Sequence, residues 1–195
     1  HKVFELKNIK KPIKIDDFGF LFGPILNSAG RLGDANIVVK LLTSNNTNEI
    51  DQIISKLIIL NEKRKRIENN IMQKINLNEI KLDLNSVIIL EKNNISEGLI
   101  GIIASKIKTY FNKPSIVITQ SANIFKGSAR SIKNFDMGKL IKKTLDLNLI
   151  ENGGGHNLAA GFTIKKENIN NFKKFIYKFS NDNILRIKSE YFSKI

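Results

Sequence analysis

Two hydroxyls and a guanidinium lie close together in the segment KGSARS, residues 126–131. The segment is typical of a strand, in which alternate side chains project from one face, so Ser128 and Arg130 share a face and Lys126 extends the basic row. A guanidinium grips a phosphate through two parallel hydrogen bonds, and the hydroxyls, including that of Ser131, can add others. The segment therefore predicts a phosphate contact. The alternative is a solvated edge strand.

A run of glycines followed by a histidine begins the segment GGGHNLAAG, residues 153–161. Gly153, Gly154 and Gly155 expose consecutive backbone N–H groups, which can form an anion-binding nest in a loop. They also let a ligand come close. His156 can donate to a phosphate oxygen, and histidine charge is tunable near neutral pH. A glycine run or a lone histidine is by itself weak evidence, but the order of residues in this segment is specific.

A third motif, GPILNSAGRL at residues 23–32, places an arginine directly after small residues. The small residues at 28–30 allow close backbone approach. Asn27 and Arg31 are candidates to touch a phosphate or a neighbouring lobe. From these residues alone, a tight turn with the arginine in a structural salt bridge is the favoured interpretation.

The sequence shows no convincing catalytic or metal site. A metal-dependent phosphodiesterase needs clustered Asp, Glu or His ligands, and Asp16-Asp17 is the only adjacent aspartate pair. The chain has two histidines and no cysteine, which also excludes disulfides. No Walker-type loop or Ser-His-Asp arrangement is evident. We therefore predict no catalytic residue and no metal ligand within this chain.

The net charge of +14 indicates a polyanionic partner, because lysine and arginine release counterions from phosphates. The alternative is an AT-rich coding bias, since Lys, Asn and Ile are all abundant. The arginines are more informative than the net charge, because only five of the 32 basic residues are arginine. An arginine retained in a lysine-rich chain suggests that its planar guanidinium is needed to bind a phosphate through two hydrogen bonds. Arg31 and Arg130 are the two that sit in short Gly/Ala/Ser motifs.

Hydrophobic residues make up 42% of the chain and charged residues 26%, as in soluble globular proteins. No apolar run reaches the roughly 18 residues that span a bilayer. The N-terminus lacks a signal pattern. We expect a cytoplasmic monomer with no membrane partner. The chain begins with His1 in the middle of an apolar pattern, so we also expect a fragment of a longer protein.

The first part of the chain is expected to form short elements followed by one long helix. Residues 1–34 are expected to be irregular or short, and the glycines and proline in residues 18–24 favour a turn. Asp34 is expected to cap the next helix. Apolar residues at three- and four-residue spacing predict a helix over 47–76, and the Asn- and Asp-rich residues 76–86 predict a linker.

Strands then alternate with helices, which predicts an α/β architecture. The predicted strands cover residues 86–90, 115–119, 124–130 and 160–164. The predicted helices cover residues 96–111, the segment after an Asp136 cap through 145, and residues 168–179.

Together the motifs resemble the RecJ family, within the wider DHH phosphoesterase superfamily. Residues 23–34 are similar to the segment after the catalytic DHH domain. Residues 97–104, EGLIGIIA, are similar to the opening helix of the DHH-associated domain. Residues 126–131 and 153–161 resemble its two substrate-facing motifs. The resemblance covers residues 16–180.

The resemblance implies a metal-dependent exonuclease that degrades single-stranded DNA from the 5′ end in recombination and repair. It implies a remnant of the catalytic lobe at 1–46, a connecting helix and linker at 47–80, a mixed-sheet α/β DHH-associated domain at 81–182, and a further segment or tail at 183–195. Mn²⁺ or Mg²⁺ would be bound outside this chain, in a preceding domain of the same polypeptide. This portion alone would grip DNA without hydrolysing it.

By resemblance, Ser128, Arg130 and His156 face the nucleic acid. The chain departs from the family pattern at Ile25, where an arginine usually follows the Gly-Pro pair. It departs again at residues 95–96, where an aromatic–His pair usually precedes the helix. Both departures bear on a phosphate or base contact.

Other functions remain open. An oligoribonuclease or cyclic-dinucleotide phosphodiesterase of the same superfamily shares the glycine–His motif, although residues 23–31 favour RecJ. A non-catalytic nucleic-acid-binding module fits the missing ligands, and a basic structural domain predicts no salt-sensitive DNA binding. Phe125 and Phe135 are the nearest candidates for base stacking, with the core as their alternative.

Overall fold

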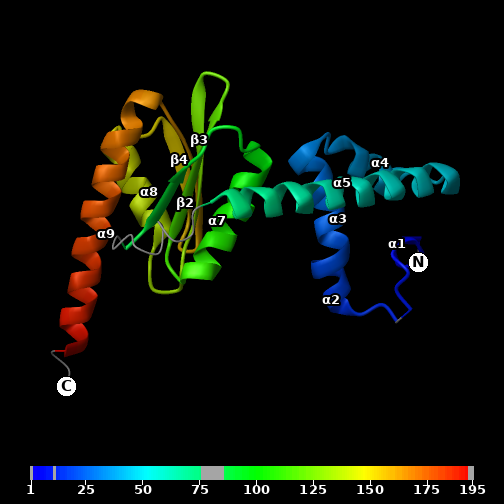
Figure 1. Cartoon of the computed structure of the whole chain (residues 1–195), viewed down its shortest axis with the longest axis horizontal. Helices are drawn as coiled ribbons and strands as arrows, with labels where there is room; N and C mark the ends of the chain where they lie inside the picture. Colours follow the sequence, from blue (N-terminus) through cyan, green and yellow to red (C-terminus); the bar gives the residue numbers. More distant parts are fainter. Residues whose placement is uncertain (1, 11, 76–85, 193–195) are drawn as a thin grey trace. The chain divides into compact units, whose positions relative to one another are not determined.

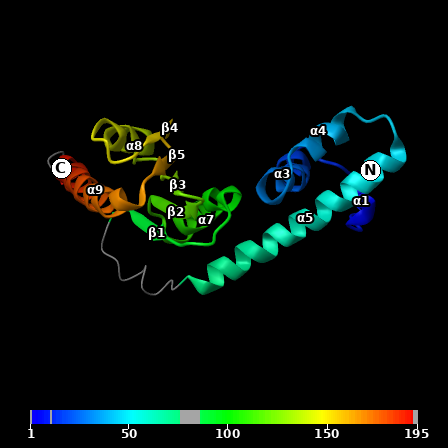
Figure 2. The same cartoon turned by 90° about the horizontal axis from the view of Figure 1, so that it is seen from above.

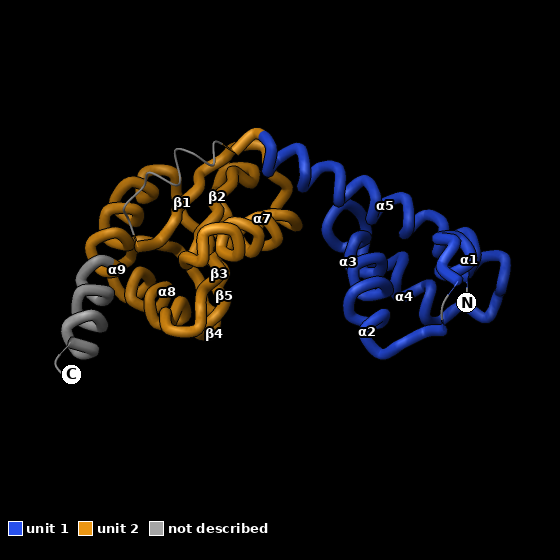
Figure 3. The backbone as a smooth tube through the Cα atoms, turned by 60° about the horizontal axis from the view of Figure 1, so that its bottom comes forward, with its two compact units in different colours: residues 1–73 blue, residues 74–195 orange. Residues whose placement is uncertain are grey.

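The computed structural model divides the chain into two compact units, coloured separately in Figure 3. Unit 1 spans His1–Gln73 and unit 2 spans Lys74–Ile195. The linker predicted between the two parts lies, except for its last residue, outside the described residues. The described residues are 2–10, 12–75 and 86–192, with side chains up to residue 180.

The elements described in unit 1 are all helices (Figure 1). The long helix predicted from the apolar spacing is confirmed as α5, which buries Ile53 and Leu57. The elements in chain order are α1 (Lys2–Leu6), α2 (Ile15–Asp17), the π-helix η1 (Phe18–Phe22), α3 (Gly23–Leu32), α4 (Asn36–Thr43) and α5 (Thr47–Lys74).

The turn predicted over residues 18–24 is wrong, because this segment is helical. The backbone N–H of Gly23 donates to the Phe18 carbonyl, a five-residue spacing that makes a π-turn. Pro24 then lies in the first turn of α3, a position where proline is tolerated. The π-turn thus carries the chain through a glycine–proline pair without leaving the helix.

The small residues of α3 let it lie close to α5. Ser28 and Ala29 are fully buried, and the Ser28 hydroxyl lies 2.6 Å from the Ile25 carbonyl oxygen and 3.2 Å from that of Leu57. The Ile25 side chain is 2% exposed and belongs to the same core. The departure from the family pattern at this position is therefore an interior residue of unit 1, which rules out a phosphate contact by its side chain.

Unit 2 is built on a five-stranded sheet in the order β1-β2-β3-β5-β4. The strands β1 and β2 are parallel and joined by α7, and the other neighbours are antiparallel. The predicted mixed-sheet α/β fold is confirmed. The elements are β1 (Ile88–Glu91), α7 (Glu97–Phe111), β2 (Ser115–Ser121), β3 (Ile124–Arg130), α8 (Met137–Asp146), β4 (Asn152–His156), β5 (Ala159–Ile164), the 3₁₀ helix η2 (Lys166–Asn168) and α9 (Ile169–Phe192).

Helices cover both faces of this sheet (Figure 2). On one face, Leu140 of α8 and Phe172 of α9 join a core with Phe125 and Phe162 of the sheet. Fully burying a side chain of this size contributes about 1.5–3 kcal/mol. On the other face, α7 packs against β2 and β3. Phe125 is therefore a core residue, and its candidate role in base stacking is wrong.

Local signals set the start of α8 as predicted. The Asp136 carboxylate accepts the backbone N–H of Lys139 at 2.9 Å, which makes it the N-cap. At α4 the helix begins at Asn36 with Ala35 as the N-cap, so the predicted Asp34 cap is displaced by one residue. Of the helices described, none has the length and apolar character needed to cross a bilayer.

Candidate nucleic-acid interface

Arg130 and His156 lie on the same face of the sheet and at the same level. Arg130 of β3 pairs with Ala159 of β5, and His156 of β4 pairs with the same Ala159 from the other side. Side chains of directly paired residues in antiparallel strands project from one face. The segments at residues 126–131 and 153–161 therefore converge, as their predicted roles require.

The basic row predicted on β3 has the expected parity. Lys126, Ser128 and Arg130 are half-buried and alternate with buried residues. The Lys126 ammonium donates to the Thr163 hydroxyl at 3.2 Å, and Arg130 Nη1 donates to Ser128 Oγ at 3.2 Å and to the Ala129 carbonyl at 2.8 Å. Because β3 is the third strand of five, the edge-strand alternative is wrong.

Glycines leave bare backbone beside this row. Ser128 pairs with Gly161 of β5, which pairs in turn with Gly154 of β4. Both glycines are exposed, and a Cβ at Gly154 would meet no atom within 4 Å. We call the sheet surface made by Ser128, Arg130, Gly154, Gly161 and His156 the open face.

The loop predicted for the triple glycine is wrong, because these residues form the edge strand β4. None of the three has a positive φ, so the expected nest of adjacent N–H groups is not formed. In an extended strand successive residues face opposite sides. A Cβ at Gly155 would overlap Ala160, and one at Gly153 would lie 2.9 Å from Ile150. Only Gly154 of the three therefore faces the open face.

A hollow of about 480 Å³ lies between α8 and β4. Its wall from α8 carries Lys139 and Lys142, two exposed residues that none of the sequence motifs includes. Their three-residue spacing on the polar side of an amphipathic helix is also that of an ordinary solvated face, so the sequence holds no distinguishing signal. The lining residues are Asp136, Gly138, Lys139, Lys142, Leu145, Gly153, Gly154, Gly155, His156 and Asn157.

The other predicted contacts lie elsewhere. Ser131 is 5% exposed, and its hydroxyl donates to the Phe135 carbonyl at 2.6 Å, so it does not join the row. Asn27 and Arg31 lie four residues apart on α3 of unit 1, on neighbouring turns of the same helix. Asn27 is exposed and Arg31 is half-buried. Their role stays a prediction.

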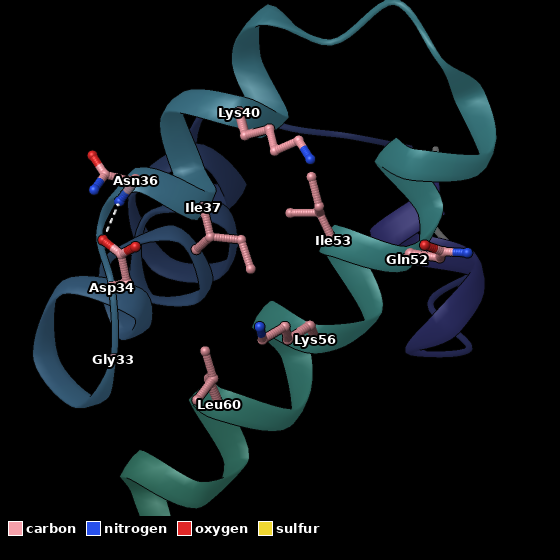
Figure 4. A pocket seen from close by; sticks show the side chains of 9 residues that line it. All are labelled: Gly33, Asp34, Asn36, Ile37, Lys40, Gln52, Ile53, Lys56 and Leu60. Atoms are coloured by element: carbon pink, nitrogen blue, oxygen red, sulfur yellow. Dashed lines mark hydrogen bonds between the residues drawn. The ribbon is translucent and has the colours of Figure 1, made fainter.

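Unit 1 has a cleft of its own, of about 520 Å³, between α4 and α5. Figure 4 shows apolar side chains from both helices pointing toward one another, and the Asp34 carboxylate accepting the Asn36 N–H at 2.9 Å. Neither Asn27 nor Arg31 lines this cleft. Its lining residues are Gly33, Asp34, Asn36, Ile37, Lys40, Gln52, Ile53, Lys56 and Leu60.

No group of three or more His, Cys, Asp or Glu that could hold a metal ion occurs among the described residues. The aspartate pair noted in the sequence does not supply one. Asp17 is buried, and its carboxylate accepts the Lys14 backbone N–H at 2.8 Å at the start of α2. The described residues of this chain therefore do not fit a divalent metal, and no metal-dependent step is derived from them.

Comparisons with known proteins agree with this architecture. Residues 84–182 match the family described as the DHHA1 domain. Over 165 residues the chain is 35% identical to the single-stranded-DNA-specific exonuclease RecJ of Haemophilus influenzae, covering 80% of this chain and 29% of that protein. It is 34% identical to RecJ of Escherichia coli, covering 84% and 29%. The chain thus spans less than a third of the length of these curated relatives.

Solved structures share the fold. The structure of RecJ from Thermus thermophilus with Mn²⁺ aligns with a TM-score of 0.80 at 24% identity, covering 93% of this chain and 27% of that one. A structure of exonuclease RecJ bound to manganese aligns with a TM-score of 0.76 at 25% identity, covering 92% and 44%.

Proposed function

Since the chain belongs to the DHHA1 domain family, we propose that it is the part of a RecJ-type exonuclease that holds the backbone of single-stranded DNA. The observation that carries the proposal is the pairing of Arg130 and His156 with one residue of β5, on one face of the sheet. The relatives named above are single-stranded-DNA-specific exonucleases, which supports the choice of ligand.

The chemistry of the open face suits a sugar–phosphate strand. Arg130 offers a planar guanidinium and Ser128 a hydroxyl, which together are groups that bind phosphate oxygens. Gly154 and Gly161 leave space for a chain passing over β5 and β4. Lys139 and Lys142 of α8, a helix that packs on the other face of the sheet, add positive charge beside the edge strand β4. These features support the proposed binding to a sugar–phosphate backbone, which would not depend on base sequence.

Hydrolysis is assigned to the rest of the intact protein. The RecJ structures of Thermus thermophilus are complexes with Mn²⁺ and with Mg²⁺. We propose that the corresponding metal ions are bound by residues outside this chain, and that this portion positions the strand for them. The intact enzyme would degrade DNA in the 5′-to-3′ direction in recombination and repair. We propose that it acts as a cytoplasmic monomer.

The proposed domain organisation follows from the same assignment. Residues 1–46 end the DHH catalytic domain, and α5 with the segment after it connects that domain to the next. Residues 81–182 form the DHH-associated domain, a range that the family match over 84–182 supports. Residues 183–195 begin a further segment or a tail.

A salt titration tests the proposal. The chain is titrated with a labelled single-stranded oligonucleotide at several salt concentrations, with polyglutamate as the control for charge alone. We expect tight binding that weakens with salt, with a logarithmic slope of about −0.7 for each phosphate that the protein neutralises. Equal affinity for polyglutamate, or binding that does not change with salt, contradicts the proposal.

A further inference from the structure

The side of α7 that faces β3 has no side chain where the Arg130 guanidinium lies. A Cβ on Gly101 would come within 2.8 Å of Arg130 Nη2, 3.2 Å of Ser128 Oγ and 3.6 Å of Arg130 Cζ. A separation below 3.0 Å is one that real Cβ atoms essentially never show. Any other residue at position 101 would therefore force the guanidinium or the helix to shift.

The atoms around Gly101 distinguish its role from that of an ordinary packing glycine. A glycine that lets a helix approach a sheet would have backbone atoms of the strand nearest to it. Here the three nearest atoms all belong to the side chains of Arg130 and Ser128. The missing side chain thus makes room for the guanidinium and not for the backbone of β3.

The other terminal nitrogen of the guanidinium, Nη1, is hydrogen-bonded to residues of β3. Arg130 Nη1 donates to Ser128 Oγ at 3.2 Å and to the Ala129 carbonyl at 2.8 Å. With Nη1 hydrogen-bonded to residues of β3 and Nη2 facing Gly101 of α7, the guanidinium lies between a strand and a helix. Fixing a side chain in advance lowers the conformational entropy that binding would otherwise cost.

We propose that Gly101 is a positioning residue, which sets the orientation of the Arg130 guanidinium for a phosphate on the open face. The consequence for DNA affinity rests on the proposed function. The steric relationship between Gly101 and Arg130 does not, so the two can be tested separately.

Thermal unfolding tests the steric part without any ligand. Alanine is a better helix former than glycine, so Gly101→Ala made in an Arg130→Ala background should raise Tm by about 2–4 °C. With Arg130 present the same change should raise Tm by less, because the new methyl group meets the guanidinium at the end of a flexible side chain, which must shift. Gly30→Ala is the matched control, since its Cβ would meet only Ala35 at 3.8 Å; its effect should be equal in both backgrounds. An effect of Gly101→Ala that is equal in both backgrounds overturns the inference.

Binding tests the consequence. Gly101→Ala should weaken binding of a single-stranded oligonucleotide by roughly tenfold, since the displaced guanidinium no longer donates its charged hydrogen bond to a phosphate. Combined with Arg130→Ala it should cause no further weakening. The Arg130 Nε–Hε NMR signal should move in Gly101→Ala and stay in place in Gly30→Ala. Independent, additive reductions in affinity would overturn the positioning role. If the unmodified chain binds no DNA, the proposed function fails while the unfolding cycle still decides the steric relationship.

Discussion

Arg130 of β3 and His156 of β4 are separated on the open face by a single residue of β5, Ala159. The relationship arises because β5 lies between β3 and β4 in the sheet, although β4 precedes it in the chain. In the hairpin of β4 and β5, His156 therefore lies level with Arg130, the last residue of the basic row on β3. A strand of DNA that crosses β5 at this level would meet both side chains.

Replacing Arg130 should weaken DNA binding without unfolding the protein. We expect Arg130→Ala to reduce affinity for single strands by about 1.5–3 kcal/mol, because a charge-assisted hydrogen bond to phosphate is removed. Arg66→Ala, at an exposed position of α5, is the arginine control. Fluorescence anisotropy at fixed salt measures both. Equal affinities for the two variants would remove Arg130 from the interface.

Neighbouring glycines of β4 should respond in opposite ways. At Gly154 a side chain meets open space, so Gly154→Val should leave Tm nearly unchanged and weaken DNA binding by covering the open face. At Gly155 a Cβ would overlap Ala160, so Gly155→Ala should destabilise the fold by about 1–3 kcal/mol. Thermal unfolding and anisotropy together separate the two effects. Normal DNA binding by Gly154→Val would show that the DNA strand does not pass over the open face at this residue.

The lysines that line the hollow beside β4 should contribute through the positive charge that they place next to this strand. We expect Lys139→Gln with Lys142→Gln to lower the salt slope of binding by about 0.7 for each phosphate that is no longer neutralised. Lys174→Gln with Lys178→Gln, exposed on α9, removes the same charge elsewhere in unit 2. Identical slopes for the two double variants would assign the effect to net charge.

The ion pair between Lys7, in the turn after α1, and Glu62 of α5 should make unit 1 sensitive to acid. The Lys7 ammonium donates to Glu62 at 2.9 Å, and this hydrogen bond holds the pKa of Glu62 below its ordinary value of 4.5. A lowered carboxyl pKa stabilises the fold above about pH 4.5, and that contribution is lost as pH falls through the lowered pKa. For a pair this exposed we expect less than about 1 kcal/mol.

Chemical denaturation across this pH range checks the contribution. Glu62→Gln should unfold with a shallower dependence on pH below about pH 4.5 than the unmodified chain. Glu167→Gln, at an exposed position of η2, is the control. Parallel pH profiles for the unmodified chain and Glu62→Gln would mean that the ion pair does not stabilise unit 1.

Features set by local sequence were predictable, whereas those set by strand pairing were not. The Asp136 cap of α8 and the parity of the row on β3 each follow from a few neighbouring residues. The glycine run has no side-chain pattern, so only pairing with β5 makes it a strand. The π-turn that carries the chain past Pro24 also has no pattern in the residues themselves.

The contact between α7 and β3 at the candidate interface could not be predicted from the sequence either. Gly101 is a helix residue like others in its segment until the fold brings Arg130 against it. Such a contact depends on how a helix packs against a sheet. The spacing of apolar residues predicts which side of the helix is buried but not which residues that side contacts. Lys139 and Lys142 of α8 likewise become candidate contacts only because the edge strand β4 lies beside them.

The central claim is that a DNA strand passes over the open face. NMR chemical shifts of the backbone amides, followed while a single-stranded oligonucleotide is added, test it directly. The signals of Gly154, His156 and Gly161 should move together with increasing DNA, while that of Leu147, exposed at the end of α8, stays in place. Shifts confined to other surfaces, with those three signals unchanged at saturating DNA, would contradict it.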